Sequence, residues 1–184
     1  TFLDWDYDSN VSAECMGEVN LFFKKLHVDK EQRDFSISWL ASCLDGNLGK
    51  NKFKMNIGYS AENGKSTEFA IHEKVFPIYY KKLSANLFNL DNGKRHKEII
   101  NLMNNPIRMA CIEELKTKKL DGDFLKEFCD GKLACEIMYG TSVTKSIQAT
   151  LHTCANKDFN MDVDAGILRR GVMQSYQSQF KKEF

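Results

Sequence analysis

Apolar side chains recur every three or four positions in the first quarter of the chain, which predicts two helices between residues 10 and 45. The first helix would carry its apolar face at Met16, Val19, Phe22, Phe23 and Leu26. The second would carry it at Phe35, Trp39, Leu40, Cys43 and Leu44. A charged cluster from Asp29 to Asp34 separates the two helices, and the turn-forming residues Asp45-Gly46-Asn47 end the second.

The pattern changes after residue 47, where short apolar runs alternate with helical periods. We expect strands at Phe53 to Ile57, Val75 to Tyr80, Ile107 to Ile112, Leu133 to Tyr139, Ser146 to Ala155 and Val172 to Tyr176. Pro77 makes the second of these an extended segment or an edge strand. We expect helices from Lys65 to about Lys74, and at Arg95 to Met103, Asp121 to Cys129 and Asp164 to Arg169. A turn is expected at Asn89 to Gly93.

This alternation of helices and strands predicts an α/β fold with a mainly parallel sheet. The two runs that flank Gly140-Thr141-Ser142 predict a β-hairpin. A length of 184 residues suits one domain with a small appendage. We therefore divide the chain into an N-terminal helical segment, 1–46, and a core, 47–184. Because position 1 is not Met, we expect a piece of a longer protein.

Composition narrows the function only slightly. The net charge is +1; Lys and Arg are outnumbered 4 to 8 by Asp and Glu in residues 1–34, and outnumber them 22 to 17 in the rest. A mildly basic core permits a phosphate-bearing ligand without demanding one. The six cysteines include no C-x-x-C pair, so we expect free thiols in a reducing, intracellular environment. No apolar run approaches the roughly 20 residues of a membrane span, so we expect no membrane partner.

The most informative stretch follows the first predicted strand and opens a helix. A glycine-bearing turn in this position can wrap backbone N–H groups around phosphates. Lys65 would then reach the β- and γ-phosphates of a nucleoside triphosphate, and the Ser66 hydroxyl would bind Mg²⁺. The usual pattern places a glycine at Tyr59, whereas this chain has it one residue earlier, at Gly58, so a surface turn before an ordinary helix is the alternative. The candidate nucleotide-binding residues are Glu62, Asn63, Gly64, Lys65, Ser66 and Thr67.

Hydrolysis of a bound triphosphate needs Mg²⁺ and a group that orients the attacking water. The predicted strand from Ile107 to Ile112 ends in Glu113 and Glu114. Glu113 is the candidate ligand of Mg²⁺ and Glu114 the candidate water-orienting group; alternatively, the strand simply turns polar as it leaves the core. Asn156 ends another predicted strand, where it is either a contact to the γ-phosphate or water, or an ordinary turn residue.

A pair of arginines, Arg169 and Arg170, ends a short predicted helix near the C-terminus. An arginine supplied by a neighbouring subunit can raise turnover by ~10³–10⁵. The alternative is a surface pair that interacts favourably with the C-terminal end of the helix dipole. Both interpretations fit the local sequence.

The order of these features resembles the ATPase core of superfamily 3 helicases. More narrowly, it resembles the primase-helicases of nucleocytoplasmic large DNA viruses of the poxvirus and asfarvirus type. The resemblance extends over nearly the whole chain. It is carried by Leu40 to Gly46, Asn63-Gly64-Lys65-Ser66-Thr67, Arg108 to Glu114, Leu125-Lys126, Gly131, Tyr139-Gly140, Asn156 and Arg169-Arg170.

The resemblance implies a P-loop NTPase with an AAA+-like three-layer domain, a short N-terminal helical segment, and a β-hairpin before the sensor strand that ends in Asn156. It also implies a homo-oligomeric ring, usually a hexamer, that uses ATP and Mg²⁺. The residues acting in cis would be Lys65, Ser66, Glu113, Glu114 and Asn156. The residue acting in trans would be Arg169 or Arg170.

Such rings translocate on single-stranded DNA and unwind duplex at the replication fork, and a primase region commonly precedes the helicase in the same polypeptide. The expected location is the host cytoplasm, at viral replication sites. In this family the hairpin reaches into the central channel and touches DNA; here it would span Leu133 to Thr150, with Lys145 near its tip. The chain departs from the family at Glu136-Ile137-Met138, where arginines are common. For Lys145, a solvated surface lysine is the alternative.

The function predicted from the sequence is an ATP-dependent DNA helicase motor. A second hypothesis is a P-loop ATPase that remodels or switches a protein partner without unwinding nucleic acid. A third is a non-catalytic assembly module in which bound nucleotide holds an oligomer together.

Overall fold

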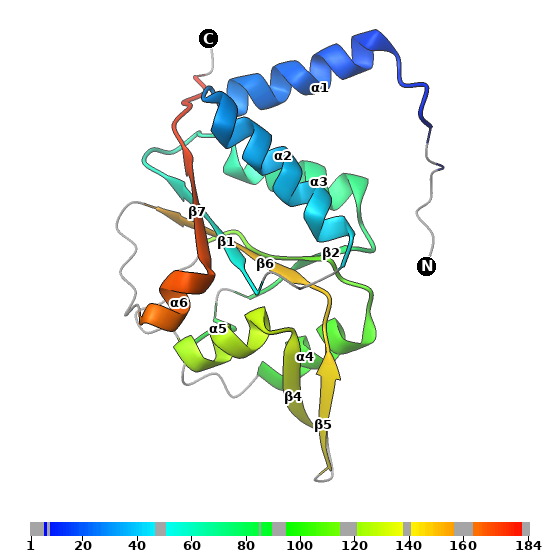
Figure 1. The fold of residues 1–184 in the computed structure, drawn as a ribbon, viewed down its shortest axis with the longest axis vertical. Coiled ribbons are helices and arrows are strands. Elements are labelled where there is room, and N and C mark those ends of the chain that lie inside the picture. The colour runs from blue at the N-terminus through cyan, green and yellow to red at the C-terminus, as the bar shows by residue number, and fades with distance from the viewer. Residues whose placement is uncertain are drawn as a thin grey trace.

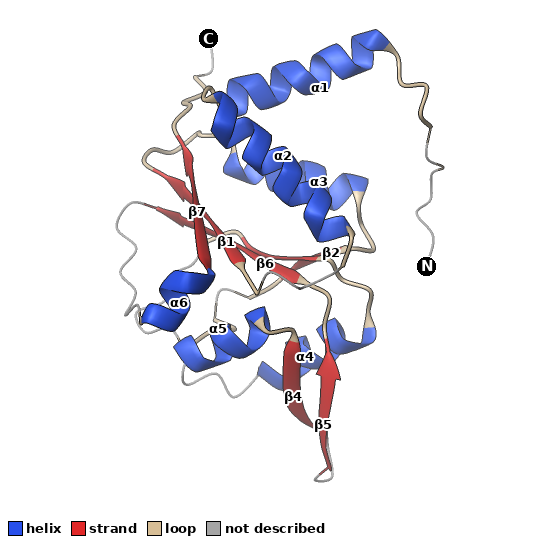
Figure 2. Cartoon of the chain, viewed as in Figure 1, coloured by secondary structure: helices blue, strands red, loops and turns tan. Residues whose placement is uncertain are grey.

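A five-stranded sheet forms the centre of the computed structural model, which describes residues 6, 8–46, 51–84, 86–89, 95–114, 121–137, 141–156 and 164–181. The strands are β1 (Phe53–Gly58), β2 (Tyr80–Lys82), β3 (Met109–Ile112), β6 (Thr150–Asn156) and β7 (Gly171–Tyr176). They lie in the order β2-β3-β6-β1-β7, and every neighbouring pair is parallel. The predicted α/β fold with a mainly parallel sheet is confirmed (Figure 2).

Helices lie on both faces of this sheet and give the domain three layers (Figure 1). One side carries α2 (Lys30–Leu44) and α3 (Lys65–Val75), with α1 (Ala13–Leu26) beyond them. The other side carries α4 (Arg95–Asn104), α5 (Gly122–Cys129) and α6 (Ala165–Arg170). The antiparallel pair β4 (Lys132–Ile137) and β5 (Thr141–Ser146) lies on that second side and projects from the body. The predicted helices are confirmed, with only small shifts at their ends.

Apolar side chains fill both spaces between the sheet and the helices. The core on the α4–α6 side includes Phe53, Met55, Ala110, Ile112, Phe124 and Ile167. The core on the α2–α3 side includes Trp39, Cys43, Phe69, Met109, Cys111 and Cys154. Successive residues of a strand point to opposite faces, so β1 and β3 are buried on both faces, as is typical of parallel strands between helices.

The predicted strand from Val75 to Tyr80 is wrong in position. Val75 is the last residue of α3, and the edge strand β2 begins only at Tyr80. The N–H of Tyr80 bonds back to Phe76 O at 2.9 Å, which closes a turn between the two elements. Pro77 lies in this turn and has no N–H to donate to a neighbouring strand. Most of the turn predicted from Asn89 to Gly93 lies outside the described residues.

The predicted hairpin exists, but its second strand is β5 rather than the run from Ser146 to Ala155. Antiparallel pairing extends from Lys132↔Ser146 to Ile137↔Thr141. The chain then crosses to the parallel sheet and continues as β6. Ile147 and Ala149 are buried in this crossing, so the apolar alternation of the sequence continues where the strand does not. The single predicted strand therefore joined the end of β5 to most of β6.

A layer of buried polar side chains lies between α3 and the sheet. Glu68 of α3 and Lys54 of β1 are each 2% exposed. The Ser36 hydroxyl, from α2, donates to Glu68 Oε1 at 3.2 Å and accepts from Lys54 Nζ at 3.1 Å. Tyr176 of β7 donates to the other oxygen of Glu68, and His27 Nε2 lies 3.7 Å from that oxygen. These contacts tie α3 to the sheet and to both N-terminal helices.

The carboxylate of Glu68 is stabilised in its charged form although it is buried. Burial by itself would raise its pKa, but the neighbouring side chains, with His27 and Lys54 foremost, outweigh burial and lower the pKa to about 2. Burial lowers the pKa of Lys54, and the charge of Glu68 opposes that shift. This pair of charges anchors α3 against β1.

We expect Glu68→Gln to destabilise the fold by about 3–5 kcal/mol near neutral pH, because it leaves Lys54 buried without a countercharge. A carboxylate with a depressed pKa contributes stability above its ordinary value of 4.5 and loses that contribution as the pH falls toward about 2. The difference in unfolding free energy between wild type and variant should therefore shrink across this window. Urea denaturation at a series of pH values measures it.

Glu73→Gln is the matched control, because Glu73 lies on the same helix but is exposed. This substitution should change the unfolding free energy by less than about 0.5 kcal/mol. Two outcomes would contradict the role of the buried charge: a Glu68→Gln protein as stable as wild type near neutral pH, or a difference in stability that does not change with pH.

Candidate functional site

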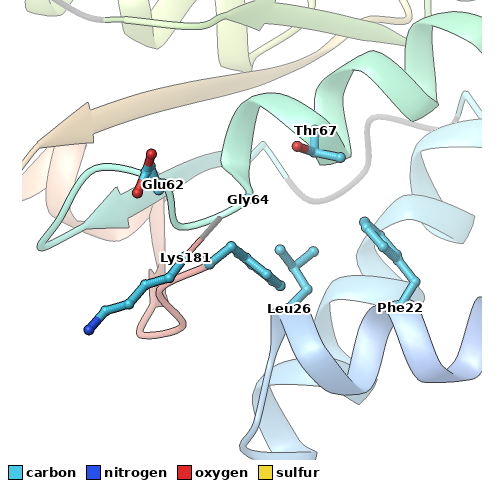
Figure 3. A pocket seen from close by; sticks show the side chains of 7 residues that line it. Phe22, Leu26, Glu62, Gly64, Thr67 and Lys181 are labelled. Atoms are coloured by element: carbon cyan, nitrogen blue, oxygen red, sulfur yellow. The ribbon is translucent and has the colours of Figure 1, made fainter. Parts of the chain in front are cut away.

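The loop between β1 and α3, residues 58–65, curls tightly and is called the phosphate loop below. Gly58 ends β1 at its entrance. Glu62 and Gly64 both have left-handed backbone angles, with φ of 58° and 86°, and such angles help to turn N–H groups toward a common point. The Asn63 amide braces the loop by donating to Ser60 O at 2.5 Å. Figure 3 shows the curl from the end of β1 into the first turn of α3.

The first turn of α3 lacks a side-chain cap. Four other helices begin at a side chain that accepts a backbone hydrogen bond, namely Ser12, Asp29, Asp121 and Asp164. At α3 the capping position is Gly64, which has no side chain. Ser66 and Thr67 in the same turn are exposed. Asn63 Oδ1 accepts a long hydrogen bond from the N–H of Lys65 at 3.5 Å. A helix start whose capping residue has no side chain favours a negatively charged ligand.

Lys65 holds its ammonium over the phosphate loop. The side chain folds back on Gly58 so closely that a Cβ at position 58 would lie 1.9 Å from Lys65 Nζ. Lys65 is 9% exposed; burial lowers the pKa of its ammonium, and Cys154 partly opposes this shift. Within the described part of the chain, no carboxylate or carbonyl pairs with this ammonium. A buried cation beside an uncapped helix start matches the chemistry of a phosphate group.

The acidic end of β3 lies at the same edge of the sheet as the phosphate loop. Gly58 pairs with Asn156 at the end of β6. β3 is the next strand beyond β6, and its last residue, Ile112, pairs with Thr153. All of these strands are parallel, so their carboxyl ends share one edge of the sheet. A single strand, β6, therefore separates the phosphate loop from Glu113, which directly follows Ile112.

Cys154 of β6 is buried between the strand that leads to Lys65 and the strand that leads to Glu113. Burial raises the pKa of this thiol to about 12; the charges of Lys65 and Lys54 oppose the shift, and those of Glu68 and Glu113 add to it. The fold thus brings these two predicted site residues to the same region.

The predicted residues at this edge differ in their surroundings. Lys82 of β2 pairs with Glu113, with Nζ 2.5 Å from Oε2, and both side chains are partly exposed. Glu114 is exposed. The Ser66 hydroxyl and the Glu113 carboxylate are hard oxygen ligands of the kind that Mg²⁺ takes. The side chain of Asn156 lies outside the described part of the structure, although its backbone is level with the loop entrance.

Arg169 and Arg170 have different surroundings. Arg170 is 9% exposed, and its Nη2 donates to the two oxygens of Asp130 at 2.8 and 3.0 Å. Its Nη1 donates to Gly166 O within α6 at 3.2 Å. Arg169 is exposed, and its contact with Lys52 uses the backbone oxygen rather than the guanidinium. The structure therefore gives Arg170 a packing role and leaves Arg169 on the surface.

Both arginines lie at the sheet edge opposite the phosphate loop. α6 leads directly into β7, whose first residue, Gly171, pairs with Phe53 at the start of β1. The phosphate loop begins at the other end of this six-residue strand, which rises about 3.3 Å per residue. Neither arginine lies beside the phosphate loop of its own chain.

Lys145 is not near the tip of the hairpin, which corrects the prediction. It pairs with Leu133, next to the last pair at the open end of β4 and β5, and its ammonium donates to Asn104 Oδ1 at 2.9 Å. The error follows from the wrong second strand, which moved the centre of the predicted hairpin toward Lys145. Residues 138–140, which join β4 to β5, lie outside the described residues.

Sequence reasoning missed two features around the phosphate loop. The C-terminal segment, residues 177–181, is fastened to the loop by the N–H of Phe180, which donates to Glu62 O at 2.8 Å. No periodic pattern marks that segment. The buried charges beneath α3 did carry a signal, because Lys54 and Asn56 interrupt the apolar run of β1 and polar groups in a central strand need partners.

No helix in the described ranges is both long enough and apolar enough to cross a membrane. Those ranges also contain no group of three or more His, Cys, Asp or Glu side chains arranged to hold a metal ion.

The chain is similar in fold to solved structures of larger proteins. It aligns with the apo A form of the NrS-1 C terminal region at a TM-score of 0.61 and 18% identity, over 86% of this chain and 37% of that one. It aligns with JCV Helicase bound to an acetamide compound at a TM-score of 0.58 and 16% identity, over 92% and 47%. A further JCV Helicase structure gives 0.55 and 15%, over 85% and 43%.

The chain thus spans less than half the length of each of these proteins. No protein-family model and no curated protein matches the sequence. The likeness shows the fold alone: this chain shares a three-layer α/β domain with a mainly parallel sheet with part of JCV Helicase.

Proposed function

We propose that the chain is the ATP-dependent motor of a DNA helicase. The observation that carries the proposal is the ammonium of Lys65, which lies buried over a curled loop at an uncapped helix start, unpaired among the described residues. A strand that ends in two acids stands at the same sheet edge, one strand away. The likeness in fold to JCV Helicase supports a helicase role for this arrangement.

Each candidate residue then has a chemical task. The backbone N–H groups of the phosphate loop and the Lys65 ammonium bind the β- and γ-phosphates of ATP and stabilise the charge that develops during transfer to water. Ser66 and Glu113 would hold Mg²⁺, which supplies further neutralisation of phosphate charge when bound. Glu114 orients the attacking water. Asn156, at the end of the strand next to β1, contacts the γ-phosphate or that water.

A second copy of the chain completes the site in this proposal. Arg169 is exposed at the sheet edge opposite its own phosphate loop, so it serves a nucleotide bound to a neighbour. Arg170 is unsuited to this task, because Asp130 and the helix backbone occupy its guanidinium. A closed ring lets every copy supply one arginine and receive one. A hexamer is the ring expected from the resemblance to superfamily 3 helicases.

The wider assignment rests on the sequence resemblance. It makes the chain part of a replicative primase-helicase of a large DNA virus of the poxvirus or asfarvirus type, with a primase region in the same polypeptide. The partner is single-stranded DNA, and the place of action is the host cytoplasm at viral replication sites. The buried free thiols agree with a reducing environment.

The alternative is a P-loop ATPase that remodels or switches a protein partner without unwinding nucleic acid. The position of Lys145 favours it, because its ammonium bonds to Asn104 near the base of the hairpin instead of standing at the tip. Contacts to a DNA backbone depend on such cations. Stimulation of hydrolysis by single-stranded DNA separates the two functions.

We expect single-stranded DNA to stimulate ATP hydrolysis by the wild-type chain. Lys65→Ala should lower turnover by at least about a hundredfold, because it removes the cation next to the transferring phosphate. Glu114→Gln should still bind ATP but hydrolyse it slowly, because an amide does not accept a proton from the attacking water. A steady-state ATPase assay with and without DNA, paired with a nucleotide-binding titration, checks these outcomes.

Lys74→Ala is the control for Lys65→Ala, since Lys74 is an exposed lysine at the far end of the same helix, and its turnover should match wild type. Normal turnover by a clean preparation of Lys65→Ala would remove Lys65 from the mechanism. A rate of ATP hydrolysis that does not change when single-stranded DNA is added would favour the ATPase that remodels a protein partner.

We expect substitutions of the two arginines to have different effects, one on turnover and the other on stability. Arg169→Ala should lose turnover by ~10³–10⁵ if the residue acts across subunits, without loss of stability, because the side chain is exposed. Arg170→Ala should instead destabilise the fold by about 1–3 kcal/mol, because the charged hydrogen bonds to Asp130 are lost. Thermal unfolding and ATPase assays on each variant distinguish these effects.

Mixing the variants gives the sharper test of action across subunits. The Arg169→Ala protein keeps an intact phosphate loop, and the Lys65→Ala protein keeps its arginine. Complete sites therefore form wherever the two chains meet in the right order, and turnover should return in the mixture. Two variants that assemble together yet stay inactive would rule out this role for Arg169.

A further inference from the structure

The C-terminal segment, residues 177–181, meets the phosphate loop and bonds to it through the backbone. The N–H of Phe180 donates to Glu62 O at 2.8 Å, and within the described residues no other backbone hydrogen bond joins the segment to the loop. The Ser178 hydroxyl donates to Leu26 O at 3.1 Å. That carbonyl belongs to the last turn of α1, where the helix leaves its own carbonyls without partners. The segment is therefore anchored on α1 and reaches from there to the loop.

The bond from Phe180 falls on a residue of the loop with an unusual backbone angle. Glu62 has a φ of 58°, in the left-handed region that residues with a side chain seldom adopt. Its side chain is exposed, so burial of that side chain does not hold the backbone. A backbone in this region persists only where its surroundings hold it. Among the described residues, the hydrogen bond from Phe180 is the one that reaches the Glu62 backbone from outside the loop.

The same bond sets the direction of an N–H group of the loop. In a trans peptide the C=O and the N–H point in opposite directions. Holding Glu62 O toward the C-terminal segment therefore turns the N–H of Asn63 away from that segment. The N–H groups of Asn63 and Gly64 have no acceptor among the described residues. Successive free N–H groups of this kind form the anion-binding concavity of a phosphate loop.

Packing gives this side of the loop only partial support. A Cβ on Gly64 would lie 2.4 Å from Leu26 Cδ1 and 3.0 Å from the Phe180 ring, so the loop touches both side chains. A cavity of about 310 Å³ adjoins this contact and is lined by Phe22, Leu26, Gly64 and Phe180, among others (Figure 3). Side chains hold a backbone by close packing, and empty volume removes that support. The hydrogen bond to Glu62 therefore matters more here than it would in a filled core.

We propose that the C-terminal segment positions the phosphate loop for anion binding, with the N–H of Phe180 as the group that holds the peptide between Glu62 and Asn63. The inference rests on the proposed binding of a triphosphate by this loop. Phe180 acts through the loop and is therefore a positioning residue. Loss of its N–H leaves Glu62 free to relax from the left-handed conformation. The loop then has to be ordered during binding, and that entropic cost lowers the affinity for phosphate.

The test measures the binding of inorganic tripolyphosphate to the complete chain by isothermal titration, because this anion probes the loop without a base or a ribose. Phe180→Pro removes the N–H and should weaken binding by about five- to tenfold, the effect of losing one hydrogen bond. Phe180→Ala keeps the N–H and loses only the ring, so its affinity should stay within about threefold of wild type. The number of binding sites per chain should not change in either variant, whereas partial unfolding would lower that number instead of the affinity.

Further variants control for the proline and for charge. Gln179→Pro places the same ring one residue earlier, where the side chain is exposed and the N–H has no acceptor among the described residues, so binding should match wild type. Glu62→Asn and Glu62→Gln remove the same charge, but Asn adopts the left-handed conformation more readily. Combined with Phe180→Pro, Glu62→Asn should therefore recover more affinity than Glu62→Gln does.

The outcomes separate failure of the positioning role from failure of the proposed function. If Lys65→Ala weakens tripolyphosphate binding and Phe180→Pro binds as tightly as wild type, the phosphate loop is supported and the positioning role is overturned. A loss in Phe180→Ala or in Gln179→Pro as large as that in Phe180→Pro would assign the effect to the ring or to the proline itself, and would overturn the role of the N–H. If folded wild type binds neither tripolyphosphate nor ATP, the nucleotide function and the positioning role fail together.

Discussion

The structure depends on positive charge at the start of α3 that no described side chain neutralises. The uncapped helix start and the Lys65 ammonium face the same curled loop. Glu68 lies on the same helix, yet Ser36 and Tyr176 hold its carboxylate beneath the helix. The Ser36 hydroxyl links that carboxylate to Lys54 of β1, whose charge stabilises it. The buried charges therefore fix the helix in place and leave the Lys65 ammonium without a countercharge among the described side chains.

Much of the fold could be predicted because it follows from local patterns. The helical spacing of apolar residues predicted the helices, and the turn after Gly58 marked the end of β1. The order of the strands has no local signal, because it depends on which segments pack together after collapse. The hairpin shows the same limit: Ile147 and Ala149 continue the apolar alternation beyond β5, and only the pairing of whole strands ends that strand at Ser146.

In the candidate site, too, local patterns predict the placement of some residues, whereas the placement of others depends on long-range contacts. The placement of Lys65 and Glu113 at the same edge of the sheet could be predicted, because each follows a buried strand and parallel strands bring their carboxyl ends to one edge. The local sequence does not distinguish Arg169 from Arg170. Their different roles become visible only through the bond of Arg170 to Asp130, which is 40 residues away in sequence. Phe180 belongs to no motif and reaches the phosphate loop only because the chain after β7 folds back on it. Long-range contacts of this kind are invisible to spacing rules.

The placement of Lys65 and Arg169 at opposite edges of one sheet has a consequence for control. In the proposed ring, the triphosphate is hydrolysed at the interface between two copies, because neither copy alone supplies both residues. On this proposal a solitary copy would bind a triphosphate without hydrolysing it, and dilution would lower turnover. Because the two residues lie beside opposite ends of the same strand, hydrolysis in the proposed ring requires a neighbouring copy and therefore depends on assembly.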